Sequence, residues 1–256
     1  MRLLAFHAGG EFADASPGDA TPNVTASNEY PYFFYVVEHP DGKVMFDCGA
    51  HRDLIDHPRG RLGSKAFDCL HLSMKPGDDA VSQIARAGIA PEDIDHVVQS
   101  HLHFDHAGGL EFFGHATAYV QERELELAYD PPELHRDFYC EADYGHRESW
   151  ERLHGDHDLF GDGRILLLAT PGHTGGHQSM LVRLPGRTII LVADAAYLPL
   201  NMEQRVLPSL VTDPEAMVAS WVRLEELRDH HNAELIFTHD PDWRTKTRVA
   251  PEAGYE

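Results

Sequence analysis

The feature that most constrains this chain is a short segment in which three histidines and one aspartate fall within six positions. These residues are His101, His103, Asp105 and His106. Residues 94–99, directly before them, form an apolar run that predicts a buried strand. Because alternate side chains of an extended segment share a face, the first two histidines should point the same way. The chain therefore leaves a strand and immediately places its polar side chains at the strand end.

The residue types in this segment are those that bind a divalent metal ion. Neutral imidazole and carboxylate are ligands for Zn(II), and also for Mn, Co or Fe. No cysteine lies in the cluster, which excludes a structural zinc-thiolate site. Gly108 and Gly109 follow and permit a tight turn. The 19 histidines of the chain make some clustering expected by chance, but four ligand-type residues at one strand end predict a metal site.

The overall charge bears on the partners of the chain. It carries 42 acidic and 21 basic residues, for a formal net charge of −21. Nucleic acids and anionic membrane surfaces are bound through basic surfaces, so both classes of partner are disfavoured. We interpret the carboxylate excess as a solvated surface that keeps the protein in solution.

Cysteine use and hydropathy bear on the location of the protein. Cys48, Cys69 and Cys140 are widely spaced and odd in number, so they predict neither a disulfide framework nor a metal motif. The apolar run in residues 1–7 is too short for a signal peptide, and no stretch approaches the ~20 apolar residues of a membrane span. We therefore expect a cytoplasmic protein.

Apolar periodicity and turn residues predict the remaining elements. The expected strands are residues 3–6, 32–38, 43–49, 94–99, 116–120, 164–169, 178–184, 188–192 and 234–237. The expected helices are residues 78–87, residues 121–129, and a long one with Asp213 as N-cap and Pro214 in its first turn. Trp221 lies on the apolar side of that helix and is expected in the core.

Three segments lack a clear pattern and are expected to be loops. They are residues 9–29, 51–76 and 133–163, of which the second is long enough to wall a site. Four histidines of the third segment lack ligand spacing and are expected at the surface. They are His135, His146, His154 and His157. A run of antiparallel hairpins with helices between them predicts an α+β fold, with sheets sandwiched by helices in one domain over residues 1–256.

Three more of the expected strands end on a residue that can bind a metal. Strand 164–169 leads to His173, strand 188–192 leads to Asp194, and strand 234–237 leads to His239. Loops at one edge of a sheet can converge, and their polar groups are free of strand pairing. Together with the first cluster, these residues fit one site.

The motif His-x-His-x-Asp-His, followed by a distant His, Asp and His, resembles that of the metallo-β-lactamase superfamily. The resemblance covers nearly the whole chain and implies an αββα sandwich with a binuclear metal site. It implies that the first metal is held by His101, His103 and His173. It implies that the second is held by Asp105, His106 and His239, and that Asp194 bridges the two.

Longer stretches are similar to the N-acyl homoserine lactone lactonases within that superfamily. These are Ser100–Gly109, Thr170–Ser179 and Asp194–Tyr197. In that family a tyrosine three residues after the bridging aspartate assists catalysis, and Tyr197 occupies that position. One departure is Thr174-Gly175-Gly176, where many members have proline; we expect no chemical consequence.

The charges of such a site suit a neutral ester. With two divalent cations, two aspartates and a bridging hydroxide, the net charge would be about +1. Metal binding lowers the pKa of water from 15.7 to about 7, which supplies the hydroxide that attacks the lactone carbonyl. The first metal and Tyr197 are expected to stabilise the oxyanion. The second metal would hold the departing alkoxide, and Asp105 is a candidate to protonate it.

A small acyl lactone also needs an apolar slot beside the metals. The candidates for substrate binding are Phe104, Tyr197, Leu210 and Val211. Phe33 or Phe67 could also contribute, although both fit an ordinary core.

The motifs leave several alternatives open. Lactonases of the 4-pyridoxolactone type share the Asp-Ala-Ala-Tyr stretch, and glyoxalase-II-like thioesterases and phosphodiesterases share the ligand set. The acidic surface argues against a nuclease. The flavodiiron proteins have glutamate where this chain has His103, so that class is also disfavoured. A metal-stabilised ligand-binding protein is the non-enzyme alternative. Some relatives with a long loop like residues 9–29 are dimers, so the resemblance suggests a homodimer.

Overall fold

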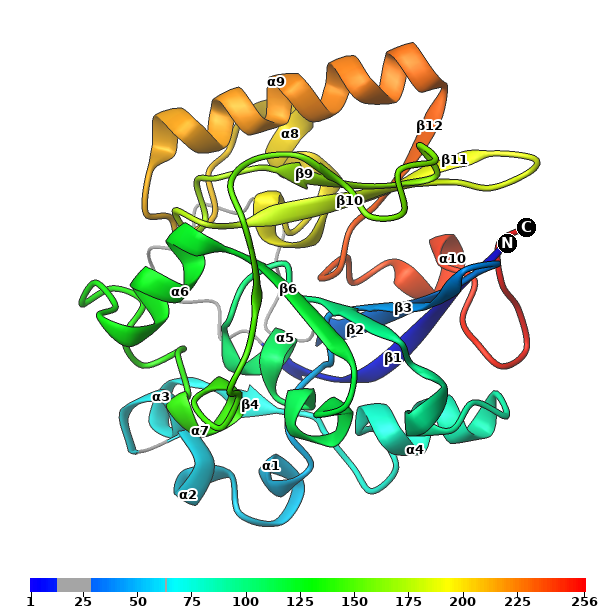
Figure 1. Cartoon of the computed structure of the whole chain (residues 1–256). Coiled ribbons are helices and arrows are strands. Elements are labelled where there is room, and N and C mark those ends of the chain that lie inside the picture. The colour runs from blue at the N-terminus through cyan, green and yellow to red at the C-terminus, as the bar shows by residue number, and fades with distance from the viewer. Residues whose placement is uncertain (13–28, 63) are drawn as a thin grey trace.

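Two mixed β-sheets lie face to face. They belong to a computed structural model, which describes residues 1–12, 29–62 and 64–256. Helices cover the outer face of each sheet, so the layers run helix, sheet, sheet, helix (Figure 1). The N- and C-termini lie together at one end, where Leu3 N donates to Tyr255 O at 2.9 Å. The predicted αββα, α+β sandwich is confirmed. That residues 1–256 form a single domain stays a prediction.

The first sheet has the order β4-β1-β2-β3-β5-β6-β7. Its strands are β1 (Arg2–Phe12), β2 (Glu29–His39), β3 (Gly42–Phe46), β4 (His71–Leu72), β5 (His96–Val98), β6 (Thr117–Gln121) and β7 (Glu151–Leu153). Strands β1 to β3 pair antiparallel, whereas β3, β5, β6 and β7 pair parallel. The aromatic and β-branched residues of β2 are buried on both faces, as a central strand requires.

The second sheet has the order β12-β11-β10-β9-β8. Its strands are β8 (His157–Asp158), β9 (Ile165–Ala169), β10 (Gln178–Arg183), β11 (Thr188–Leu191) and β12 (Ala233–Ile236). Strands β8 to β11 pair antiparallel and β12 joins β11 in parallel. Apolar side chains from the inner faces of both sheets form the core between them, including Phe33, Tyr35, Val182 and Ile189.

The α-helices of the described residues divide between the two outer faces, the loops and the C-terminal segment. They are α1 (Asp53–Asp56), α2 (Pro58–Leu62), α3 (Ser64–Cys69), α4 (Ala80–Arg86), α5 (Phe104–Ala107), α6 (Glu122–Tyr129), α7 (Glu141–Tyr144), α8 (Pro199–Gln204), α9 (Pro214–His231) and α10 (Trp243–Lys246). Helix α4 lies on the side of the first sheet and α9 covers the second (Figure 1). None of the helices in the described ranges is both long and apolar enough to cross a membrane.

The predicted strands and helices are present, but the irregular segments contain more structure than the sequence pattern indicates. The expected loop at residues 9–29 is wrong at both ends, because β1 continues to Phe12 through a register shift and β2 begins at Glu29. Its middle, residues 13–28, lies outside the described residues. Short elements α1 to α3 and β4 occupy 51–76, and α7, β7 and β8 occupy 133–163.

The expectation of a run of antiparallel hairpins is also wrong in part. Both sheets contain parallel pairs, because α4 connects β3 to β5 and α9 connects β11 to β12 as crossovers. Helices α8 and α10 were not predicted, since four to six residues are too few for a visible helical period.

Helix α9 begins as predicted. The Asp213 side chain accepts hydrogen bonds from the backbone N–H groups of Glu215 and Ala216 at 3.1 and 3.0 Å, with Pro214 in the first turn. Trp221 is completely buried against the second sheet, which confirms its place in the core. Its indole N–H donates to the carbonyl of Ala195. The helix is thereby attached to the residue that follows Asp194.

We expect Trp221→Ala to lower the free energy of unfolding by about 3–5 kcal/mol, because it leaves a cavity under α9. Val222→Ala is the matched control on the same helix, since Val222 is 42% exposed; it should change stability by less than about 0.5 kcal/mol. Chemical denaturation of both variants in the same metal state measures the difference. Equal losses in the two variants would contradict the packing described here.

Candidate functional site

The polar cluster lies at the edge where β5, β9, β11 and β12 end. The loop after β5 leads into α5, and His103 occupies the N-cap position of that helix. Gly108 follows α5, where a Cβ would overlap the backbone nitrogen of His51. A larger residue could not bring this loop so close to the neighbouring segment, so the predicted need for glycine is met.

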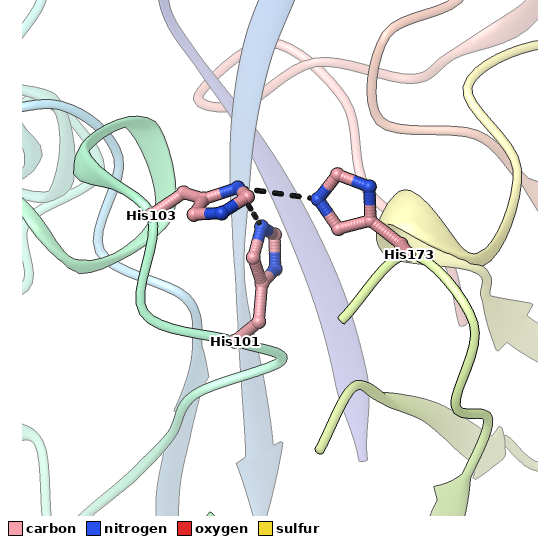
Figure 2. Close-up of side chains that lie close together, drawn as sticks. All are labelled: His101, His103 and His173. Atoms are coloured by element: carbon pink, nitrogen blue, oxygen red, sulfur yellow. Dashed lines mark hydrogen bonds between the residues drawn. The ribbon is translucent and has the colours of Figure 1, made fainter. Parts of the chain in front are cut away.

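Three histidine rings converge on one point (Figure 2). The Nδ1 atom of His103 lies 3.0 Å from Nε2 of His101 and 3.2 Å from Nε2 of His173. All three side chains are buried, with at most 2% of each residue exposed. These are the three residues that the sequence resemblance assigns to a first metal ion, and their ring nitrogens are close enough to share one.

A second group lies beside the first and shares Asp194 with it. Nε2 of His106 lies 3.4 Å from Oδ2 of Asp105, and Nε2 of His239 lies 3.7 Å from the same oxygen. Oδ1 of Asp194 is 3.2 Å from Nε2 of His106 and 3.0 Å from Nε2 of His239. The structure therefore brings the predicted second ligand set together as well.

The two carboxylate oxygens of Asp194 face different groups. While Oδ1 faces His106 and His239, Oδ2 lies 3.4 Å from Nε2 of His173 and 3.9 Å from Nε2 of His101. This is the placement that a carboxylate needs to bridge two ions. Asp194 is therefore located where the resemblance predicts a bridging ligand.

Hydrogen bonds on the outer side of His101 and His106 determine which ring nitrogen carries the hydrogen. The Ser100 hydroxyl donates to Oδ2 of Asp47 at 2.8 Å, so it accepts from Nδ1 of His101 at 3.0 Å. Nδ1 of His106 donates to the same Asp47 oxygen at 2.9 Å. In the neutral rings, the Nε2 atoms of both histidines therefore hold lone pairs directed into the site.

In His173 and His239, hydrogen bonds to backbone carbonyls determine which ring nitrogen carries the hydrogen. Nδ1 of His173 donates to the carbonyl of Leu210 at 2.9 Å, and Nδ1 of His239 donates to the carbonyl of Pro31 at 2.9 Å. A carbonyl can only accept, so the Nε2 atom of each neutral ring again faces inward with a lone pair. For His239 this lone pair would face a carboxylate oxygen of Asp194.

Lone pairs and carboxylate oxygens about 3 Å apart in a buried site repel one another unless cations lie between them. The donor set of imidazole nitrogens and carboxylate oxygens, without thiolate, suits a borderline divalent metal. Nε2 of His106 has no hydrogen-bond partner among the described residues although it is buried. The residues present therefore fit two divalent cations.

The electrostatic environment differs between the two groups of the site. Burial opposes the charged form, but the carboxylates of Asp105, Asp194 and Asp47 hold the pKa of His106 well above its usual value. Burial and the neighbouring rings of His106 and His103 hold the pKa of His101 well below its usual value. The first group therefore stays neutral, as metal ligation requires.

A buried glutamate on α6 ties two ligand loops together. Oε1 of Glu124 accepts from the backbone N–H of Leu102 at 3.0 Å and from the Tyr139 hydroxyl at 2.7 Å. Oε2 accepts from the Thr174 hydroxyl at 2.6 Å. Leu102 lies between two ligands and Thr174 follows His173, so one carboxylate fixes both loops. A Cβ on Gly176 would overlap the Glu124 backbone, which explains the glycine there.

A pocket opens above the two groups and contains the predicted Tyr197. Its described lining residues are Glu11, Tyr30, His103, Phe104, Asp105, Phe138, Asp194, Tyr197, Pro208, Ser209, Leu210 and His239. The Tyr197 ring packs edge-on against His173 and His239, with centroids 5.7 and 5.3 Å away. Its hydroxyl lies 3.4 Å from Nδ1 of His173.

The predicted apolar slot is present only in part. Phe104 and Leu210 line the pocket. Val211 packs instead against the apolar cluster beneath α9. Phe33 is buried between the sheets and Phe67 lies under Arg59. The described residues of segment 51–76 do not line this pocket either.

Besides Glu124, the sequence pattern does not identify two further acidic residues at the site, Glu11 and Asp47. Glu11 lines the pocket, and its carboxylate accepts from the Tyr32 hydroxyl at 3.1 Å. Burial and the nearby Asp105 charge raise the pKa of Glu11 to about 7 in the metal-free protein. Asp47 orients His106 from the end of β3. A lone acidic residue gives no spacing signal, so nothing in the pattern separates these two from surface carboxylates.

The prediction that His135 lies at the surface is wrong. It is 1% exposed and contacts His103, while its neighbours Leu134 and Arg136 are exposed. His146 and His154 are exposed as predicted, and His157 is half-buried in β8.

Comparisons with known proteins agree with this geometry. Residues 28–239 match the metallo-beta-lactamase superfamily. The N-acyl homoserine lactonase AttM of Rhizobium radiobacter is 35% identical over 233 residues, which cover 89% of this chain and 88% of the relative. The N-acyl homoserine lactonase AiiA of Bacillus thuringiensis subsp. kurstaki is 30% identical over 223 residues, 87% of this chain and 86% of that protein.

A solved structure is also similar over nearly its whole length. It is an N-acyl homoserine lactone hydrolase with the product N-hexanoyl-L-homoserine bound at the catalytic metal center. It superposes with a TM-score of 0.85 at 29% identity, covering 98% of this chain and 97% of that chain. The chain therefore belongs to the metallo-beta-lactamase superfamily and, within it, to the family of the N-acyl homoserine lactonases.

Proposed function

We propose that this protein is a two-metal lactonase that hydrolyses the ring ester of N-acyl homoserine lactones to the open hydroxy acid, and so removes quorum-sensing signals. The observation that carries the proposal is the position of Asp194, whose two oxygens face two histidine groups at the floor of a pocket that contains Tyr197. The relatives named above, which are described as lactonases of this substrate class, support the choice of substrate.

The site residues divide between holding the ions and acting on the ester. His101, His103 and His173 would hold one ion; Asp105, His106 and His239 would hold the other, with Asp194 shared between them. Two divalent ions there, with zinc as the first candidate and Co, Mn or Fe as alternatives, would supply hydroxide at neutral pH and polarise the ester carbonyl.

Tyr197 and Asp105 are the two groups of this chain that we assign to proton and charge handling. Tyr197 lines the pocket with its hydroxyl 3.4 Å from Nδ1 of His173, and we assign to this hydroxyl a hydrogen bond to the oxygen that becomes negative in the transition state. The Asp105 carboxylate lines the same pocket and can take up the proton of the attacking hydroxide and pass it to the departing ring oxygen.

The charges that line the pocket favour a neutral substrate. Its described lining contains three carboxylates, those of Glu11, Asp105 and Asp194, and no lysine or arginine. An anionic substrate would therefore find no cationic side chain to bind it. Phe104, Phe138 and Leu210 offer an apolar surface for an acyl chain. We also propose a cytoplasmic location, on the basis of the composition, and a homodimer, on the basis of the resemblance.

The first test is the metal content. We expect elemental analysis to give close to two equivalents per chain, and His239→Ala to lower that number. Chelation should lower the melting temperature, because ligands from four separate loops must be gathered when the metal is absent. The exposed His146→Ala variant is the control and should retain both ions. A wild-type protein that saturates at one ion would contradict the binuclear assignment.

The second test concerns Tyr197. We expect Tyr197→Phe to lose about 10- to 100-fold in kcat/KM, because it removes one of the donors to the oxyanion while an ion still shares the charge. Metal content and melting temperature should stay at the wild-type values, since the ring and its contacts with His173 and His239 remain. Full activity of this variant would reassign Tyr197 to packing.

The third test concerns the substrate. Lengthening the acyl chain of the lactone should lower KM, because each buried methylene contributes about 0.8 kcal/mol until the slot is full. The unsubstituted lactone is the control for ring opening without acyl binding. Reaction in ¹⁸O-labelled water should place label in the new carboxylate, as attack at the carbonyl carbon requires.

A different preference would change the assignment. If acyl homoserine lactones are inert while a thioester or a phosphodiester turns over above about 10⁴ M⁻¹s⁻¹, only the metallohydrolase assignment survives. Strong preference for another lactone, such as 4-pyridoxolactone, would keep the reaction type and reject the proposed substrate.

A further inference from the structure

His103 differs from the other four histidine ligands in how its outer nitrogen is satisfied. In those four rings the outer nitrogen donates to a serine hydroxyl, a carboxylate or a backbone carbonyl. The outer nitrogen of His103 is Nε2, and it lies 3.1 Å from Nδ1 of His135. A second imidazole can either donate or accept, so this contact alone does not assign the hydrogen of His103.

The hydrogen bonds on the other side of the His135 ring show which of the two rings donates in this contact. The Thr212 hydroxyl donates to the carbonyl of His173 at 2.8 Å, since a carbonyl can only accept. Its oxygen therefore accepts from Nε2 of His135, which lies 3.0 Å away. With its one hydrogen on Nε2, the neutral His135 ring has a lone pair on Nδ1. That lone pair accepts from Nε2–H of His103.

We propose that His135 and Thr212 form a positioning relay that holds His103 in the tautomer and orientation in which Nδ1 binds the first metal ion. The hydrogen bonds run from His103 to His135, then to Thr212, and end on the backbone of His173. Neither residue contacts the substrate position, so both act through the ligand. The inference rests on the proposed function, because it requires that the site holds metal.

Packing around His135 supports this role. Its ring stacks on that of His103 with centroids 5.2 Å apart and an interplanar angle of 24°. It also packs edge-on against His173 at 5.5 Å. The ring is 1% exposed, so water does not compete for its nitrogens. The stack restricts rotation of the His103 ring while the hydrogen bond selects its protonated nitrogen.

Thr212 connects this relay to the second ligand loop. Its backbone N–H donates to the carbonyls of Gly172 and His173 at 2.9 and 3.0 Å. The same turn carries Leu210, whose carbonyl accepts from Nδ1 of His173. The segment before α9 thus sets the orientation of two ligands of the first ion, one directly and the other through His135.

Two pairs of variants test the relay. His135→Phe keeps a stacked ring but removes the acceptor, and His135→Gln returns an amide oxygen that can accept. Thr212→Val keeps the side-chain shape but removes the hydroxyl, and Thr212→Ser returns it. The exposed His146→Phe variant is the control for loss of a histidine near the same segment. The measurements are zinc dissociation constants by competition with a chelator, and imidazole ¹H–¹⁵N spectra of the zinc-loaded proteins.

We expect His135→Phe and Thr212→Val to weaken binding of one of the two zinc ions by about 10- to 100-fold, the range for loss of a group that orients a ligand. Thr212→Ser and His135→Gln should recover most of this loss, and His146→Phe should equal the wild type. In the wild-type spectrum we expect a protected Nε2–H signal from His103. This signal should be lost or exchange faster in His135→Phe and Thr212→Val.

Two outcomes would overturn the proposal. Wild-type zinc affinity in both His135→Phe and Thr212→Val would show that His135 only fills space. Equal losses in Thr212→Val and Thr212→Ser would show that the hydroxyl is not part of the relay. If His135→Phe does not fold, the comparison of Thr212→Val with Thr212→Ser still tests the relay. A wild-type protein that binds no metal would reject the proposed function instead, which distinguishes that failure from failure of the relay.

Discussion

The imidazole and carboxylate groups of the polar cluster repel one another, and much of the surrounding fold serves to hold them in place. Lone pairs of at least four imidazoles and the oxygens of Asp105 and Asp194 face one another at about 3 to 4 Å among largely buried side chains. Such a cluster is stable only with cations or protons inside it. The surrounding carboxylates raise the pKa of His106 well above its usual value, and the chemistry of the donors predicts two divalent ions in the site.

The fold holds these groups together against that repulsion by tying the ligand loops from outside. Asp47 and Glu124 are buried carboxylates that accept hydrogen bonds from the ligand loops rather than entering the metal site. Helix α9 adds a third tie, since its first residues and Trp221 contact the loops of His173 and Asp194. A site built from the ends of strands and held by such contacts is preorganised before substrate arrives.

The candidate ligands could be identified from the sequence because their signal is local. Each of them follows an apolar run, and four of them lie within six positions, so spacing alone indicates a shared site. The fold class also followed from the order of the elements. The parallel pairing within each sheet did not, because strand order depends on crossovers that periodicity does not report.

The residues that support the ligands could not be predicted, because their roles depend on contacts between distant segments. His135 lies between exposed neighbours, so its burial has no periodic signal. The composition of residues 9–29, rich in glycine and small polar residues, predicts a loop at Glu11, although this residue lies on β1 and lines the pocket. Leu210 and Val211 are adjacent and equally apolar, so nothing in the sequence distinguishes the one that lines the pocket from the one that packs beneath α9.

Anomalous scattering from crystals of the zinc-loaded protein would show whether Asp194 lies between two metal ions. We predict two peaks about 3.5–4 Å apart, the separation typical of two-metal sites. One should lie among His101, His103 and His173, and the other among Asp105, His106 and His239, each next to a different oxygen of Asp194. A single peak, or two peaks of which one lies away from Asp194, would contradict the claim.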